Sequence, residues 1–140
     1  MNLREKKLFL LDMDGTLYLD ETLFPSVPEF LSHIRDAGGR YLFLTNNSSR
    51  GAADYVEKLR RLGIAAGEED FLTSVDALLY ALRREGLMEK RLYVFGTASL
   101  RAHLAQAGCR LASGREDAQV LVCGFDTELT FQKLEDACIL

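Results

Sequence analysis

Four short runs of apolar residues stand out along the chain, and none of them alternates strictly between apolar and polar positions. Such a run is typical of a strand that is buried on both faces of a sheet. We therefore predict buried strands at Leu8–Leu11, Tyr41–Leu44, Leu92–Phe95 and Val120–Cys123. A further short strand is expected at Asp70–Thr73.

Between these runs, apolar residues recur every three or four positions, the spacing that places them on one face of a helix. Helices are therefore predicted over Val27–Ile34, Tyr55–Leu62, Val75–Leu82 and Leu100–Ala107. Ser26 with Glu29, and Thr73 with Asp76, have the spacing of a helix-capping box. Strands that alternate with helices predict an α/β fold, Rossmann-like, with a parallel sheet.

The pattern also suggests two parts. Residues 1–86 form the first, residues 87–140 form the second, and the boundary lies in the charged stretch Arg83–Arg91. After Thr130, a fresh amphipathic stripe formed by Phe131, Leu134, Ala137 and Cys138 runs to the last residues of the sequence. Because a finished domain seldom stops along the apolar face of a helix, we expect the chain to be a C-terminally truncated fragment.

Composition excludes several classes of protein. Hydrophobic residues make up 48% of the chain and charged residues 27%, which is ordinary for a globular protein and too apolar for a disordered one. No apolar run is long enough to span a membrane. The net charge of −4, without an arginine-rich block, gives no reason to expect nucleic acid or membrane as a partner. We interpret Cys109, Cys123 and Cys138 as reduced, mostly buried thiols of a cytoplasmic protein.

The candidate chemistry begins where the first strand ends, at Asp12-Met13-Asp14-Gly15-Thr16. Side chains two positions apart on an extended segment point the same way, so Asp12 and Asp14 both project from the carboxyl end of the strand. Open α/β sheets bind ligands at that edge. Two adjacent carboxylates favour a hard cation such as Mg²⁺, and a carboxylate can also attack phosphorus. The alternative is an Asp-Gly turn with two solvated acids.

The second strand runs into Thr45-Asn46-Asn47-Ser48-Ser49-Arg50. A hydroxyl, amides and backbone N–H groups at the start of a helix can hold a phosphate or an oxyanion. We expect Thr45 and Asn46 to contact a ligand. Ser48 and Ser49 are interpreted as helix caps.

The strings DMDGTLY and LTNNSS resemble the first two motifs of the haloacid dehalogenase superfamily, most closely its NagD-like, p-nitrophenyl-phosphatase branch. The later stretch VLVCGFDTELTFQKLEDA resembles a segment of that branch's α/β cap domain. The resemblance implies a Rossmann-like core in residues 1–86 and the beginning of the cap in residues 87–140. The segment between Asp12 and Thr45 has room for a turn and one helix but not for a helical cap, which favours this branch.

The resemblance also implies roles for single residues. Asp12 would be the nucleophile and Asp14 the general acid and base. The Asp12 carboxylate and the Asp14 main-chain carbonyl would bind Mg²⁺. The Thr45 hydroxyl and the Asn46 main-chain amide would hold the phosphoryl group. The implied enzyme is a Mg²⁺-dependent phosphatase that acts on a small sugar, nucleotide or organic phosphate through an aspartyl-phosphate, and a homo-oligomer could form through its cap.

The chain departs from the family pattern in one respect. The family has a lysine and an acidic loop after the cap, and this sequence contains neither; Lys133 lies in the cap-like segment and is not assigned that role. We therefore expect these residues to turn over substrate weakly or not at all. The alternatives are a phosphate-binding or phosphoacceptor module without efficient turnover, and phosphoryl transfer between sugars. Asp126 is a further candidate for influencing substrate choice.

Overall fold

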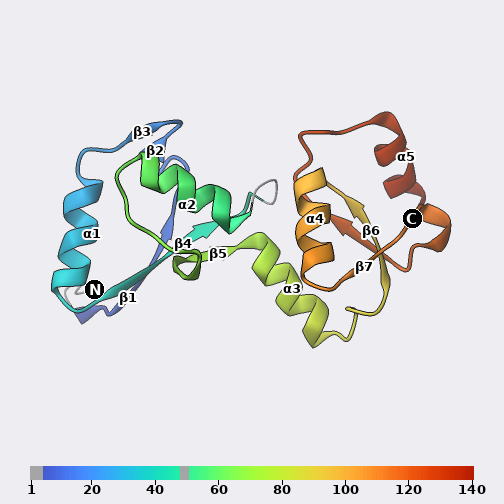
Figure 1. Ribbon diagram of the computed structural model, residues 1–140, viewed down its shortest axis with the longest axis horizontal. Coiled ribbons are helices and arrows are strands. Elements are labelled where there is room, and N and C mark those ends of the chain that lie inside the picture. The colour runs from blue at the N-terminus through green and yellow to red at the C-terminus, as the bar shows by residue number, and fades with distance from the viewer. Residues whose placement is uncertain (1–4, 48–50) are drawn as a thin grey trace. The chain divides into compact units, whose positions relative to one another are not determined.

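The computed structural model describes residues 5–47 and 51–140, which form two compact units (Figure 1). The first comprises the described residues within Met1–Asn46 and Ala52–Leu72, and the second those within Asn47–Gly51 and Thr73–Leu140. Each unit combines helices with a sheet that contains parallel strands, so the predicted α/β class is confirmed. The assignment of 1–86 to a core and 87–140 to a cap remains a prediction, although the helix predicted over Val75–Leu82 belongs to the second unit.

The first unit is built on a sheet with the strand order β1-β4-β5, in which β1 and β4 are parallel. A short antiparallel hairpin, β2-β3, follows β1. The elements are β1 (Leu8–Asp12), β2 (Tyr18–Leu19), β3 (Thr22–Leu23), α1 (Val27–Asp36), β4 (Arg40–Thr45), α2 (Ala52–Arg61), the 3₁₀ helix η2 (Glu68–Asp70) and β5 (Phe71–Thr73). All of the strands and helices predicted in this part of the chain are therefore present.

Burial on β1 differs from the prediction. Leu8 and Leu10 are 56% and 57% exposed, whereas Phe9 and Leu11 pack against the core of the first unit. The two faces of β1 therefore differ: the core covers the face of Phe9 and Leu11, and the face of Leu8 and Leu10 is exposed. The centre of this core is formed instead by β4, where Phe43 is fully buried and packs against the ring of Phe71.

The start of α1 also differs from the prediction. Ser26 is the N-cap residue, but its side chain makes no capping hydrogen bond. Its backbone is already in the right-handed helical region, whereas a capping side chain needs an extended backbone. In addition, Pro28 occupies the second helical position and has no N–H to donate. The capping box predicted from Ser26 and Glu29 is therefore wrong.

The second unit contains a parallel sheet with the strand order β7-β6-β8. Its elements are α3 (Ser74–Arg84), β6 (Arg91–Phe95), α4 (Ala98–Gln106), β7 (Arg110–Leu111), η3 (Arg115–Asp117), β8 (Val120–Cys123) and α5 (Phe131–Ile139). The core includes Val75 and Leu79 of α3 together with Leu92 and Val94 of β6. The predicted strands and helices of this region are confirmed.

Helix α3 begins with the capping box that the sequence predicts. The Thr73 hydroxyl accepts a hydrogen bond from the Asp76 main-chain N–H at 3.1 Å. In return, the Asp76 carboxylate accepts hydrogen bonds from the main-chain N–H of Thr73 at 2.8 Å and from its hydroxyl at 2.7 Å. Thr73 has the extended backbone that this arrangement needs.

The cysteines are all free thiols, but only Cys109 is buried, so the expectation of mostly buried thiols is wrong for Cys123 and Cys138. Burial raises the pKa of the Cys109 thiol, and the nearby Arg83 opposes this in part. Helix α5 forms as predicted, yet no side chain on it is buried, and Phe131 is 79% exposed. Within residues 5–47 and 51–140, no helix has the length and apolar character required to cross a membrane.

Candidate functional site

The first strand delivers Asp12 and Asp14 to one edge of the sheet. Both residues are exposed, while Met13 between them is fully buried, which is the alternation predicted for an extended segment. The parallel register pairs Asp12 with Leu44, so Thr45 follows at the same edge. The structure thus brings the two predicted motifs to the carboxyl ends of neighbouring strands, where open α/β sheets bind ligands.

A hydroxyl fixes the Asp12 carboxylate. The Thr16 Oγ1 donates a hydrogen bond to Asp12 Oδ2 at 2.9 Å. The chain can return to Asp12 within four residues because Gly15 adopts a φ of +77°, a left-handed conformation that glycine tolerates best. The Gly15 main-chain N–H donates to the Tyr18 carbonyl at 2.8 Å, which closes the turn. Thr16 was not predicted as a site residue, although it stands within the DMDGTLY motif.

A buried lysine accompanies Asp14. Lys58 Nζ, on α2, lies 3.6 Å from Asp14 Oδ1, and its side chain is 9% exposed against 57% for the Asp14 side chain. Sequence reasoning missed Lys58. The sequence does contain an indication of it. Lys58 lies in the apolar stripe of α2, three residues after Tyr55 and next to Leu59, and a solvated lysine is not expected at such a position.

The end of β4 provides Thr45 and Asn46. Thr45 is buried, and its hydroxyl lies 3.3 Å from the Tyr55 hydroxyl of α2, within hydrogen-bond distance. Asn46 is exposed. The predicted helix caps Ser48 and Ser49 fall outside the described residues. The described part of the second motif therefore places one buried hydroxyl and one exposed amide residue beside the carboxylate pair.

The carboxylates fit a partial magnesium site. Asp12 and Asp14 supply the hard oxygen donors that Mg²⁺ prefers, and Mg²⁺ is usually held by one or two carboxylates with water and phosphate oxygens completing its coordination. No group of three or more His, Cys, Asp or Glu side chains that could hold a metal ion occurs in the part of the chain that the structure describes. Within those described residues, Asp12 and Asp14 are the carboxylates placed to contribute to such a site.

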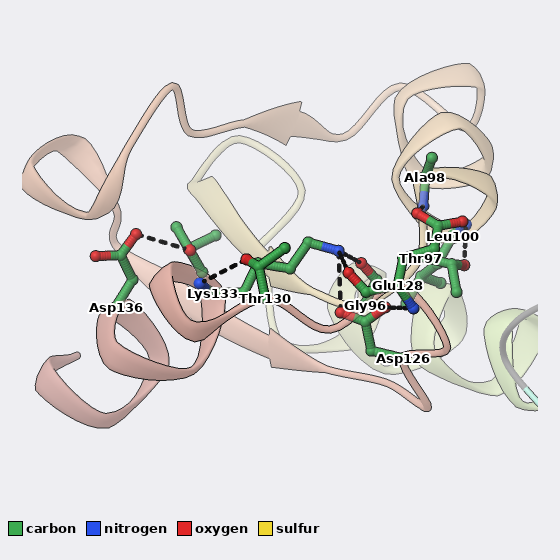
Figure 2. A network of polar contacts seen from close by, with 10 residues as sticks. Gly96, Thr97, Ala98, Leu100, Asp126, Glu128, Thr130, Lys133 and Asp136 are labelled. Carbon is green, nitrogen blue, oxygen red and sulfur yellow. Dashed lines mark hydrogen bonds and ion pairs between the residues drawn. The ribbon is translucent and has the colours of Figure 1, made fainter.

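Asp126 and Lys133, in the second unit, serve the structure of that unit (Figure 2). Lys133 Nζ donates to the Asp126 carboxylate at 3.0 Å and to the carbonyls of Gly96 and Glu128 at 3.1 Å each. The Asp126 side chain is only 3% exposed. Its carboxylate thus holds the loop before α5, and an influence of Asp126 on substrate choice stays a prediction.

Three known proteins show what this chain resembles. It is 36% identical to the glycerol-3-phosphate phosphatase of Rattus norvegicus, over 96% of this chain and 50% of that protein. The structure of 4-nitrophenylphosphatase from Thermotoga maritima superimposes with a TM-score of 0.88 at 37% identity, covering 98% of this chain and 51% of that one. The structure of a glycerol phosphate phosphatase from Mycobacterium tuberculosis in complex with magnesium superimposes with a TM-score of 0.86 at 29% identity. The match covers 97% of this chain and 41% of that one.

The chain spans about half the length of these relatives. Residues 9–110, which include both motifs and most of the described elements, match the family described as haloacid dehalogenase-like hydrolase. The likeness to 4-nitrophenylphosphatase agrees with the branch suggested by the motifs. The edge of the sheet that carries Asp12, Asp14 and Thr45, together with this match, shows that the chain belongs to the haloacid dehalogenase-like hydrolases.

Proposed function

We propose that this chain carries the nucleophilic half of a Mg²⁺-dependent phosphatase that acts on small phosphomonoesters through an aspartyl-phosphate. The observation that carries the proposal is the placement of Asp12 and Asp14, both exposed, at the same sheet edge as Thr45. The names of the relatives support the reaction class, because two of those reported above are phosphatases of glycerol phosphates.

In the first step, an oxygen of the Asp12 carboxylate attacks phosphorus, and the bond from phosphorus to the leaving alcohol breaks. The Thr16 hydrogen bond engages Oδ2, which orients the carboxylate for attack by the other oxygen. The Thr45 hydroxyl and the Asn46 main-chain N–H bind the phosphoryl oxygens as charge develops on them. Asp14 gives its proton to the leaving alcohol oxygen.

In the second step, Asp14 takes a proton from a water molecule, which attacks the phosphorus of the aspartyl-phosphate. The products are inorganic phosphate and the regenerated Asp12 carboxylate. The exposure of Asp14 suits both tasks, since it must reach the leaving group and then water. Mg²⁺ held by the Asp12 carboxylate and the Asp14 carbonyl would supply charge neutralisation and orientation of the phosphate.

The substrate class that we propose is a small phosphorylated metabolite. Nothing in the described site reads a base or a sugar, so the proposal stops at the phosphomonoester group. Assembly into a homo-oligomer through residues 87–140 is likewise a proposal from the family resemblance.

The test is phosphate release from p-nitrophenyl phosphate by the 140-residue chain, with and without Mg²⁺, in the wild type and in Asp12→Asn. The matched control is Asp20→Asn, because Asp20 is an exposed aspartate of the same unit. Its φ of +52° is a conformation that asparagine adopts as readily as aspartate. We expect Asp12→Asn to abolish the Mg²⁺-dependent release that the wild type shows, and Asp20→Asn to keep it.

Three results would decide between the alternatives. Slow Mg²⁺-dependent release that vanishes in Asp12→Asn supports the phosphatase. Covalent phosphate on the chain without release would indicate the phosphoacceptor module instead. Release that survives Asp12→Asn contradicts the proposal for this chain.

A further inference from the structure

A lysine lies inside the buried face of α2, where a charged group is costly. Lys58 is buried beside Tyr55 and Leu59 of the same helix. Transfer of an ammonium group out of water is unfavourable unless a counter-charge or another favourable contact compensates it. The position of Lys58 therefore needs an explanation, and none of the catalytic steps above uses it.

Two contacts hold the Lys58 ammonium. It lies 4.0 Å from the centroid of the Tyr18 ring, a distance at which a cation is attracted to the face of an aromatic ring. It also lies 3.6 Å from Asp14 Oδ1. Tyr18 is fully buried, so the cation is packed against a fixed surface. The Asp14 carboxylate is the more exposed partner of the pair.

Because Lys58 is buried and Asp14 is exposed, Lys58 positions Asp14 and not the reverse. A carboxylate that is 57% exposed is free to take several rotamers in water, whereas a cation fixed by packing favours the rotamer that meets it. The same cation contacts Asp14, two residues after Asp12, and offsets part of the negative charge at this end of β1. Helix α2 thus supplies a fixed positive charge to the carboxyl end of β1.

We infer that Lys58 is a positioning residue: it holds the Asp14 carboxylate in the orientation used for proton transfer and offsets the charge of the Asp12–Asp14 pair. The role of Asp14 in this inference rests on the proposed function. The contact between Lys58 and Asp14 is independent of that proposal. Lys58 differs from the lysine expected by family resemblance, which would follow the cap, because it lies on α2 and contacts Asp14.

The first test needs neither metal nor turnover. The carboxyl carbon of Asp14 is observed by NMR in chain labelled with ¹³C-aspartate, at one neutral pH. The variants are Lys58→Met, which keeps the length of the side chain without its charge, and Lys58→Arg, which keeps the charge. We expect the Asp14 resonance to move in Lys58→Met and to return toward the wild-type position in Lys58→Arg. An unchanged resonance in a folded Lys58→Met overturns the inference.

The reciprocal variant covers the case in which Lys58→Met does not fold. Asp14→Asn alters an exposed side chain, and its effect is observed at the ¹⁵N resonance of the Lys58 ammonium. We expect that resonance to shift, while the resonance of Lys6, an exposed lysine of the same unit, stays in place. A Lys58 resonance that does not respond to Asp14→Asn overturns the inference.

The second test measures function. Because Lys58 opposes a bound cation, we expect Lys58→Met to bind Mg²⁺ roughly twofold tighter or more while kcat falls about tenfold with little change in KM. Lys58→Arg should restore the wild-type Mg²⁺ affinity and kcat. If Lys58 had only a structural role, Lys58→Met would instead lower both the Mg²⁺ affinity and kcat. If the wild type binds no Mg²⁺ and Asp12→Asn changes nothing, the proposed function fails, and the NMR result still decides the contact. A Lys58→Met variant that leaves Mg²⁺ affinity and kcat unchanged contradicts the positioning role.

Discussion

At the scale of single residues, the site combines predicted and unpredicted side chains. Asp12 and Asp14 lie where alternation along a strand places them, and that regularity is local enough to be predicted from sequence. Thr16 and Lys58 reach the carboxylates through a turn and through the packing of a helix, respectively. Those contacts depend on three-dimensional structure, so sequence spacing alone did not identify them.

Thr16 provides a test of how the nucleophile is held. Removing the hydroxyl in Thr16→Ala leaves Asp12 without its orienting hydrogen bond, and such a bond to a charged group is worth about 1.5–3 kcal/mol. We therefore expect kcat for phosphate release to fall about tenfold or more, since each 1.4 kcal/mol corresponds to about a factor of ten.

The control is Thr16→Ser, which keeps the hydroxyl and should retain most of the rate. The measurement is steady-state kinetics with p-nitrophenyl phosphate. Equal rates in Thr16→Ala and the wild type would show that the hydrogen bond does not contribute to attack.

At the scale of elements, every strand and helix predicted from the apolar pattern is present. Helix capping and the burial of strand faces were predicted only in part. The box at Thr73 formed because its backbone is extended, whereas the box at Ser26 did not form because Pro28 removes a donor and the backbone is already helical. The exposed face of β1 could not be predicted either, because exposure depends on which elements pack against each face of the strand. Composition and periodicity describe a strand without specifying its place in the sheet.

The two helix starts form a matched pair for mutation. Thr73→Ala removes a side chain that accepts from Asp76, so we expect the free energy of unfolding to fall by about 1 kcal/mol. Ser26→Ala removes a side chain with no capping bond and should change it by less than about 0.5 kcal/mol.

Urea unfolding followed by circular dichroism measures both values, and hydrogen exchange of the α3 amides locates the effect of Thr73→Ala. A loss at Ser26 equal to that at Thr73 would contradict this account of the two caps.

The Lys133 network offers a second test at this scale. Lys133→Met leaves the nearly fully buried carboxylate of Asp126 without its cation, and breaking a buried ion pair on one side costs about 3–5 kcal/mol. Because the Lys133 side chain is 25% exposed, solvent screens part of its interaction with Asp126. We therefore expect the free energy of unfolding to fall by an amount toward or below the lower end of that range.

The double variant Lys133→Met with Asp126→Asn should recover part of the loss, because no uncompensated charge then remains. Lys90→Met, an exposed lysine of the same unit, is the control and should be near neutral. The measurement is urea unfolding. A double variant no more stable than Lys133→Met would contradict the role of the ion pair.

At the scale of the whole molecule, two motifs that are distant in sequence meet because parallel pairing of β1 and β4 brings their carboxyl ends together. The α/β class and this meeting of strand ends could be predicted, since both follow from alternating strands and helices. The division into compact units could not, because it depends on whether α3 packs with the elements before it or after it. The chain belongs to the haloacid dehalogenase-like hydrolase family and spans about half the length of its relatives.

The most direct test of the account is to trap phosphate on Asp12. In Asp14→Asn, the second step loses its base, while the first step needs no proton because p-nitrophenolate leaves as an anion. After acid quenching of Asp14→Asn with p-nitrophenyl phosphate and Mg²⁺, mass spectrometry of the peptides should find phosphate on Asp12. The further variant Asp12→Asn in the same background should carry none. Phosphate on any other residue, or turnover by Asp14→Asn at the wild-type rate, would contradict the proposed mechanism.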